Sequence, residues 1–227
     1  MKNDEDAKLA KALYNSHADD YFNNQNQYPV IAYLRKEVNK LIKSPKDKYI
    51  LFAGCGDTEE ARYAVEKGAK VTGIDISEKC IELSKKKFPK QKFEVMDFED
   101  TTFKNGSFDV IISIFAIMYK ESLDSVLVEF KRLIKKNGHI IIVVPHPIRK
   151  MIKYSKMDYF ARGKRVEIWK GNKRFNYYRT MEDYINTITK NGLILDKIYE
   201  HKVPKESEES PDAEIMHPHH LIIVARK

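Results

Sequence analysis

The sequence predicts an α/β fold built on a mostly parallel sheet, and three observations support this. An apolar run ends at Ala53 in the turn Gly54-Cys55-Gly56. A second apolar run, starting at Val71, ends in Asp75. Further β-branched runs alternate with segments whose apolar residues have helical spacing, an alternation typical of parallel strands linked by helices.

The glycine turn and the strand-end aspartate predict a site for a nucleotide-type cofactor. Gly54 and Gly56 let the backbone approach a ligand closely, and Asp75 can accept hydrogen bonds from ribose hydroxyls. A nicotinamide-binding loop needs G-x-G-x-x-G, but the third glycine position holds Glu59, where a carboxylate would repel a pyrophosphate. The pattern therefore disfavours NAD and FAD and favours an adenosine cofactor without phosphates, with S-adenosyl-L-methionine as the leading candidate.

The segment from Phe52 to Thr58 resembles the glycine loop of the class I S-adenosylmethionine-dependent methyltransferases, of the type that acts on small molecules. That loop usually reads acid-x-Gly-x-Gly-x-Gly. Gly54 and Gly56 match it, whereas Phe52 stands at the acid and Thr58 at the third glycine. We expect Thr58 to cap a helix that begins at Glu59, an acid favourable in a first turn.

The resemblance covers roughly residues 10–227 and implies the rest of the architecture. It implies a doubly wound, Rossmann-like sheet of seven strands in three α/β/α layers, mostly parallel with an antiparallel last strand beside the fifth. The apolar runs place these strands at 49–53, 71–75, 93–97, 110–114, 139–144, 193–199 and 220–225.

The resemblance also implies roles for residues at the strand ends. An acid after the third strand accepts from the adenine amino group in this family, which implies that role for Asp97, and Phe98 would flank the ring. Ile76 and Ile114 would line the adenine and the neighbouring surface.

Helices are predicted from apolar spacing and from end signals. We expect helices at 4–24, 30–42 (with Pro29 near its start), 123–134 and 181–190. The third would end in the cationic turn that closes with Asn137-Gly138, a C-cap signal. The last would begin with a capping box formed by Thr180 and Asp183.

The 227 residues suffice for one sizeable α/β domain. We expect a helical cap at 1–45 and a methyltransferase domain at 46–227 that carries an insert at 149–179. In related methyltransferases such a cap covers the cofactor, and Tyr14 and Tyr21 resemble aromatic residues that contact its methionine end. Ordinary packing of both tyrosines is the alternative.

Composition predicts a cytoplasmic protein without a membrane partner. No apolar run approaches the length of a membrane span, and residues 1–8 are too polar for a secretory signal. Cys55 and Cys80 are the only cysteines, which fits a reducing compartment. Cys55 is interpreted as a small side chain in a tight turn rather than as a nucleophile.

The net charge of +8 is concentrated in the insert. Residues 149–179 hold eleven lysines and arginines but only two acids, and the pattern around Gly171-Asn172 predicts a hairpin of 166–170 with 173–178. Because the insert follows the fifth strand, it should rise above the ligand-binding edge of the sheet. A basic, aromatic flap there favours an anionic or aromatic acceptor, unless its lysines only keep it solvated.

Four residues are candidates for the chemistry. His146, directly after the fifth strand, is the best candidate base because imidazole titrates near neutral pH; a hydrogen bond to the backbone is its alternative role. Tyr119, beyond the fourth strand, is the second candidate, able to contact or orient the acceptor. Tyr178 and Arg179 would reach the same cleft from the insert, with Arg179 suited to a carboxylate or phosphate.

No metal site is predicted. Four histidines lie near the C-terminus, at His201, His217, His219 and His220. Adjacent histidines that enter a strand point to opposite faces, so they do not converge on an ion.

We therefore expect methyl transfer to an O or N atom of a small, anionic or aromatic acceptor. Family members that methylate exocyclic amines of bases carry Asn- or Asp-Pro-Pro-aromatic after the fourth strand, where this chain has residues 113–116, Ser-Ile-Phe-Ala. An RNA methyltransferase that uses the basic insert is one alternative, since phosphate neutralisation drives such binding. A non-catalytic partner or sensor that binds S-adenosylmethionine is the other, suggested by Phe52 and Thr58.

Overall fold

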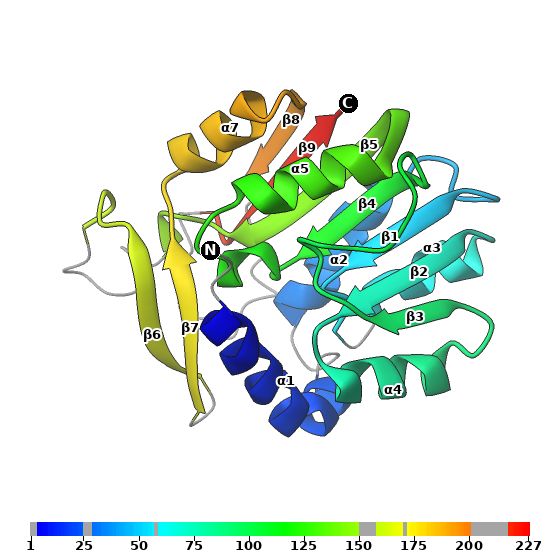
Figure 1. Cartoon of the computed structure of the whole chain (residues 1–227), viewed down its shortest axis with the longest axis horizontal. Coiled ribbons are helices and arrows are strands. Elements are labelled where there is room, and N and C mark those ends of the chain that lie inside the picture. The colour runs from blue at the N-terminus through cyan, green and yellow to red at the C-terminus, as the bar shows by residue number, and fades with distance from the viewer. Residues whose placement is uncertain (1–3, 25–28, 57–58, 150–157, 170–171, 201–217) are drawn as a thin grey trace.

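A seven-stranded sheet with helices on both faces forms the centre of the fold (Figure 1). This computed structural model describes residues 4–24, 29–56, 59–149, 158–169, 172–200 and 218–227. In spatial order the strands are β3 (Lys92–Val95), β2 (Lys70–Asp75), β1 (Tyr49–Ala53), β4 (Phe108–Ile114), β5 (Ile134–Pro145), β9 (His220–Arg226) and β8 (Ile194–Glu200).

The strand pairing confirms the predicted fold class. The strands from β3 to β5 pair in parallel, and β9 lies antiparallel between β5 and β8. Because the parallel strands all end at one edge of the sheet, the loops that follow them gather there.

The helices predicted at 4–24, 30–42, 123–134 and 181–190 are present with ends within one residue of those bounds, whereas the helix at 78–87 was not predicted and the one expected from Glu59 begins as a 3₁₀ turn. The helices are α1 (Asp4–Asn24), α2 (Pro29–Leu41), α3 (Arg62–Glu66), α4 (Glu78–Lys87), α5 (Asp124–Leu133) and α7 (Met181–Lys190), with short 3₁₀ turns η2 (Glu59–Ala61) and η3 (Ile117–Tyr119). Thr58, the predicted cap of the helix that begins at Glu59, lies outside the described residues. None of the helices described is long and apolar enough to cross a bilayer.

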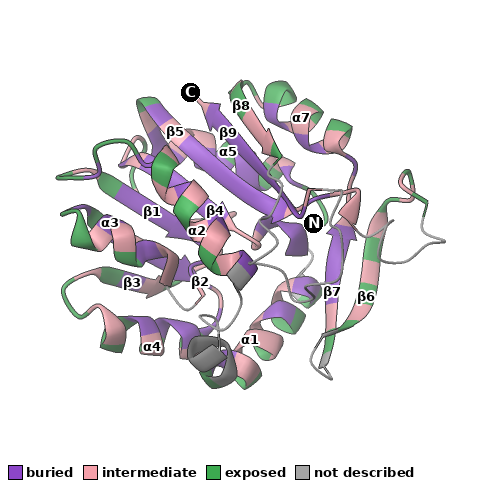
Figure 2. Ribbon diagram, turned by 180° about the vertical axis from the view of Figure 1, so that it is seen from behind, coloured by how far each residue is buried: buried purple, intermediate pink, exposed green. Residues whose placement is uncertain are grey.

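Side chains alternate between the two faces of the sheet along each strand, so the core consists of two layers, one on each face. Leu51 and Ile111 face a cluster that includes Phe130 of α5, whereas Ile50 and Ile112 face the cluster formed with α2 and α3. Successive side chains of a strand point to opposite faces, so an unbroken apolar run is what a sheet covered on both faces requires. Figure 2 shows that β5 and β9 are buried along most of their length.

The fifth strand begins earlier than predicted. α5 ends at Leu133, and Ile134 is already extended, with ψ 139°, and pairs with Phe108. The pairing then shifts register before it resumes, so residues 135–138 form a bulge. The predicted C-cap at Asn137-Gly138 was therefore wrong, because Asn137 takes its left-handed φ of 67° inside this bulge rather than at a helix end.

The insert contains the predicted hairpin, β6 (Gly163–Trp169) paired with β7 (Asn172–Tyr178). It forms a separate two-stranded sheet that lies beside α1 (Figure 1). Phe175 and Tyr177 are buried in a cluster with Ala10 of α1 and Tyr119 of η3. The hairpin therefore packs on the helical cap and on the turn after β4.

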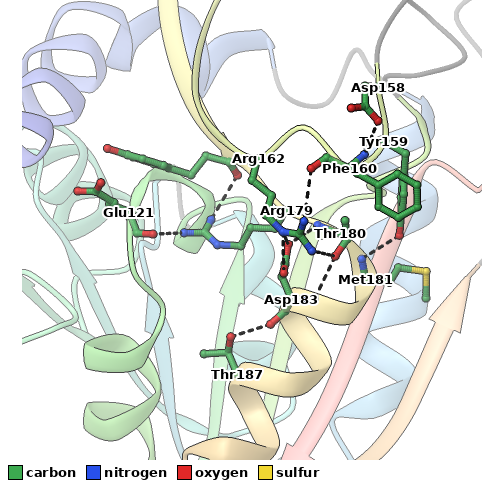
Figure 3. A network of polar contacts seen from close by, with 11 residues as sticks. Glu121, Asp158, Tyr159, Phe160, Arg162, Arg179, Thr180, Met181, Asp183 and Thr187 are labelled. Carbon is green, nitrogen blue, oxygen red and sulfur yellow. Dashed lines mark hydrogen bonds and ion pairs between the residues drawn. The ribbon is translucent and has the colours of Figure 1, made fainter.

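The capping box at the start of α7 is bonded to the segment that enters the hairpin (Figure 3). The Thr180 hydroxyl accepts from the Asp183 amide at 3.2 Å, and the Asp183 carboxylate accepts from the Thr180 amide at 2.8 Å, which confirms the predicted box. Arg162, just before β6, donates to the same carboxylate at 2.8 Å. Arg162 and the capping box together lower the pKa of Asp183, although burial acts in the opposite direction.

Replacing Thr180 by Ala should lower the free energy of unfolding by about 1–2 kcal/mol, because the buried N-cap acceptor is lost. Urea denaturation measures this loss. Thr189→Ala is the matched control, because its exposed hydroxyl bonds only to carbonyls of the preceding turn in the same helix. Equal destabilisation by both variants would contradict the role of the cap.

Candidate functional site

A cavity of about 410 Å³, here the main cavity, opens at the carboxyl ends of the parallel strands. Its walls come from α1, from the turns after β1 and β2, and from the segments that follow β3 and β4. Eight of the residues predicted to bind the cofactor line it: Tyr14, Gly54, Gly56, Asp75, Ile76, Asp97, Phe98 and Ile114. Tyr119, a candidate for the chemistry, lines it as well.

The turn after β1 depends on glycine for two reasons. Gly54 has a φ of 73° and Gly56 a φ of 48°, values in the left-handed region that glycine tolerates best. A Cβ atom at Gly54 would also lie 2.3 Å from the Cβ atom of Ala116. The amides of Gly54 and Cys55 both donate to the Ile74 carbonyl, at 2.8 and 2.9 Å, which ties this turn to the end of β2.

The Asp75 carboxylate is held in place at the end of β2. Its two oxygens accept separately from the Gly56 amide and the Ser77 amide, each at 2.9 Å. Burial raises the pKa of Asp75, and the backbone donors oppose that rise. Burial also raises the pKa of the neighbouring Cys55 thiol well above its usual value, so Cys55 is a protonated, space-filling side chain.

The acids after β3 surround a lysine that sequence reasoning missed. Lys120 donates to Asp97 at 2.6 Å and to Glu99 at 2.5 Å, and its ammonium lies 5.3 Å from the centre of the Phe98 ring. All four residues line the main cavity. The position of Lys120, directly after the candidate Tyr119, is the only sequence signal that pointed toward it.

Aromatic hydroxyls meet at the α1 side of the main cavity. The hydroxyls of Tyr14 and Tyr119 lie 3.0 Å apart, with their rings edge to face. The Tyr119 ring also contacts Phe175 of the hairpin edge to face. Burial raises the pKa of Tyr119, so its phenol is protonated at neutral pH and is suited to donate a hydrogen bond.

Asp6 is a second cavity residue that sequence reasoning missed. It is only 4% exposed, and its carboxylate accepts from the Lys164 ammonium and the Tyr177 hydroxyl of the hairpin. Asp6, Ala10 and Tyr14 recur every four residues and so share one face of α1. Counting back from Tyr14 in steps of four could have identified Asp6 as a residue on the cavity side of α1.

α1 is also fixed near its middle, by Asn15. The side-chain oxygen of Asn15 accepts from the Ser77 hydroxyl at 2.6 Å and from the Lys79 amide at 3.2 Å. Contacts to α4 and to the hairpin thus hold α1 against the main cavity. Tyr21 lies farther along α1, where the side chains are outside the described residues.

The structure does not bring His146 to the main cavity. His146 lines a separate small pocket of about 30 Å³, together with Tyr178 and Arg179. The Ile148 amide donates to its Nδ1 at 3.2 Å, and its Nε2 lies 2.6 Å from the Glu200 carboxylate. Both ring nitrogens are therefore engaged, with Nδ1 as acceptor and Nε2 as donor.

Arg179 and Tyr178 also bind protein groups. Arg179 donates to the backbone carbonyl of Lys120 and to that of Glu121 (Figure 3), and the Tyr178 hydroxyl donates to Glu167. Arg179 therefore connects the end of β7 to the segment that lines the main cavity.

Among the residues described, no group of three or more His, Cys, Asp or Glu side chains is arranged to hold a metal ion. His219 and His220 are buried, while His201 and His217 lie outside the described residues.

Comparison with known proteins shows which proteins this chain is similar to. A family model described as a methyltransferase domain matches residues 51–142. The chain is 29% identical over 120 residues to a malonyl-[acyl-carrier protein] O-methyltransferase of Hamiltonella defensa, covering 51% of this chain and 46% of that protein. It is 32% identical over 122 residues to a demethylmenaquinone methyltransferase of Chlorobaculum parvum, covering 53% and 49%. The chain thus spans about half the length of these curated relatives.

Solved structures match over more of the chain. A Listeria monocytogenes protein assigned to the S-adenosylmethionine-dependent methyltransferases has a TM-score of 0.74 and 28% identity, over 85% of this chain and 95% of that one. An S-adenosylmethionine-dependent methyltransferase from Mesorhizobium loti has a TM-score of 0.73 and 22% identity, over 84% and 96%. The second likeness shows the fold alone.

Replacing Gly54 by Ala should destabilise the chain by at least about 2 kcal/mol more than the same change at Gly106. Both glycines have a positive φ, but a Cβ atom at Gly106 meets nothing within 4 Å. The pair therefore separates backbone strain, about 1–2 kcal/mol, from the clash with Ala116. Urea denaturation of both variants measures the difference, and equal losses would refute the close approach.

Proposed function

We propose that this chain, which belongs to the class I S-adenosylmethionine-dependent methyltransferases, transfers a methyl group from S-adenosylmethionine to an oxygen or nitrogen atom of a small aromatic acceptor. The main support for this proposal is the extent of the main cavity. The main cavity is continuous from the glycine turn and the two strand-end acids, Asp75 and Asp97, to the aromatic pair Tyr14 and Tyr119.

The described lining of the main cavity fits this cofactor. Asp75 presents a fixed carboxylate suited to ribose hydroxyls, and Asp97 one suited to the adenine amino group. Phe98, Ile76 and Ile114 offer apolar surface to the ring. We assign Tyr14 to the methionine end, and the family resemblance extends that role to Tyr21, whose side chain is not described.

The same region is unsuited to a pyrophosphate. Burial alone would raise the pKa of Glu59, but hydrogen bonds from Arg62 and Lys87 outweigh it and lower that pKa to about 2. Glu59 is therefore ionised at neutral pH at the start of η2, close to where a dinucleotide would place its phosphates. This charge favours S-adenosylmethionine over NAD or FAD.

S-adenosylmethionine, when bound, supplies a methyl group that its positive sulfur already activates. The residues of the chain then have to orient the acceptor and exclude water, and alignment of this kind can contribute roughly 7–11 kcal/mol. Tyr119 is placed to donate a hydrogen bond to the acceptor, and Asp6 to accept one. We place neither His146 nor Arg179 at the reacting atoms, because neither lines the main cavity.

The charged side chains that line the main cavity indicate which acceptors it favours. The charged side chains described there are Lys120 and the acids Asp6, Asp75, Asp97, Glu99 and Glu121. An anionic acceptor would meet this excess of carboxylates, so we propose an uncharged or cationic aromatic acceptor with an O–H or N–H group. Tyr14, Phe115 and Tyr119 supply aromatic surface for it.

RNA remains the alternative acceptor, because of the basic insert, but several of its cations are already paired. Lys164 bonds Asp6, Arg162 bonds Asp183, and Arg174 lies 3.5 Å from Glu167. These contacts reduce the charge that is left for phosphates.

The direct test incubates the chain with methyl-labelled S-adenosylmethionine and a panel of phenols, anilines, benzoates and total RNA. We expect label in phenols or anilines and none in RNA. Label in RNA alone, or in benzoates alone, would overturn the proposed acceptor class. No label with any acceptor, despite cofactor binding, would favour the sensor alternative.

Replacing Asp75 by Ala should weaken binding of S-adenosylhomocysteine by about 100-fold, because two hydrogen bonds to a charged acceptor are lost. Isothermal titration calorimetry measures the change. His146→Ala is the control, since His146 lies in the small pocket, and should leave the affinity within about twofold. Equal losses in the two variants would contradict the assignment.

Replacing Tyr119 by Phe should lower kcat with the acceptor found in the screen by about 10–100-fold. The cofactor affinity should change far less than kcat, because the Tyr119 hydroxyl reaches the cofactor side only through its contact with Tyr14. Steady-state kinetics and calorimetry on one preparation measure both quantities. Tyr63→Phe, on α3 away from the main cavity, is the control. Unchanged kcat in Tyr119→Phe would remove Tyr119 from the reaction.

A further inference from the structure

Lys120 occupies an unusual position at the wall of the main cavity. Its side chain is only 15% exposed, and its ammonium lies between two carboxylates, 2.6 Å from Asp97 Oδ2 and 2.5 Å from Glu99 Oε2. The ring of Phe98 lies on another side of the same ammonium. One partly buried cation thus contacts three consecutive residues after β3.

Each member of this cluster is fixed by further bonds. Asp97 Oδ1 accepts from the Glu99 amide at 3.0 Å, so the two oxygens of Asp97 have different donors and the carboxylate cannot rotate without breaking one bond. Glu99 Oε1 accepts from the Ser125 hydroxyl at 2.5 Å. The cluster is therefore ordered before any ligand enters.

The backbone of Lys120 is held as well. Its carbonyl accepts from the Arg179 guanidinium, as does that of Glu121 (Figure 3), and its amide donates to the Ile117 carbonyl at 3.1 Å. The insert thereby fixes the lysine from behind, while the two acids fix its ammonium. This explains why Arg179, although outside the main cavity, is bonded to the segment that lines it.

We propose that Lys120 is a positioning residue that holds the Asp97 carboxylate as the acceptor for the 6-amino group of the cofactor's adenine. The inference rests on the proposed function and deepens it. A carboxylate oxygen has about two acceptor sites, so Asp97 can receive a ligand donor while it keeps its bonds to Lys120 and Glu99. Without the ammonium, Asp97 and Glu99 would repel each other, and Asp97 would leave this orientation.

If Lys120 positions Asp97 in this way, it should increase the preference of the site for adenine over a 6-oxo base as well as the affinity for the cofactor. A carboxylate held as an acceptor favours a 6-amino group and repels a 6-oxo group. An unrestrained carboxylate can turn away from the 6-oxo group, so that discrimination between the two falls.

The test measures binding of S-adenosylhomocysteine and of its 6-oxo analogue, S-inosylhomocysteine, by calorimetry. The native chain should prefer the adenine compound by about 100-fold. Lys120→Met should bind S-adenosylhomocysteine about tenfold more weakly and show a preference of tenfold or less. Lys120→Arg, which keeps the charge, should retain more of the preference. Lys136→Met, at an exposed lysine in the β5 bulge, is the matched control and should equal the native chain.

Three results would overturn the inference: unchanged affinity in Lys120→Met, an equal loss for both compounds, or a widened preference. Circular dichroism and thermal unfolding confirm that each variant is folded, and Lys120→Arg supplies the comparison if Lys120→Met is not. Failure of the native chain to bind S-adenosylhomocysteine would instead overturn the proposed function, and the inference with it.

Discussion

The close approach of two backbone segments is the constraint on which the rest of the site depends. Gly54, in the turn after β1, faces Ala116, after β4, so closely that any side chain would collide. This approach leaves the amides of the turn free to bind the end of β2 and the Asp75 carboxylate. Because parallel strands end at one edge of a sheet, the same turn sets the floor of a cavity that extends from the acids after β2 and β3 to α1.

The walls of the main cavity are held by polar contacts between segments far apart in the chain. Asn15 ties α1 to the start of α4, and Asp6 ties it to the hairpin. Arg179 ties the end of the hairpin to the carbonyls of Lys120 and Glu121. The basic insert therefore acts chiefly on the architecture of the site: several of its cations bind acids or carbonyls of the chain instead of facing the cavity.

Local patterns in the sequence predicted the sheet and many of the residues that line the main cavity. Gly54 and Asp75 were found because a turn and a strand end are encoded by adjacent residues. The spacing from Tyr14 indicates which face of α1 holds Asp6, but its ion pair was missed because its partner Lys164 is 158 positions away, a separation that no local pattern spans. His146 was expected in the cleft because it follows a strand, but its amide donates to the His219 carbonyl at 2.9 Å. Pairing with the antiparallel β9 thus continues past the end of β5, and His146 faces the small pocket instead.

We assign the main cavity to an adenosine cofactor without phosphates. Calorimetric titration of the native chain with S-adenosylmethionine and S-adenosylhomocysteine, with NADH as control, is the first test of this assignment. We expect binding of the first two at about micromolar levels and none of NADH, because Glu59, at the third glycine position of the nicotinamide-binding pattern, is ionised. Binding of NADH, or of none of the three compounds, would contradict the assignment.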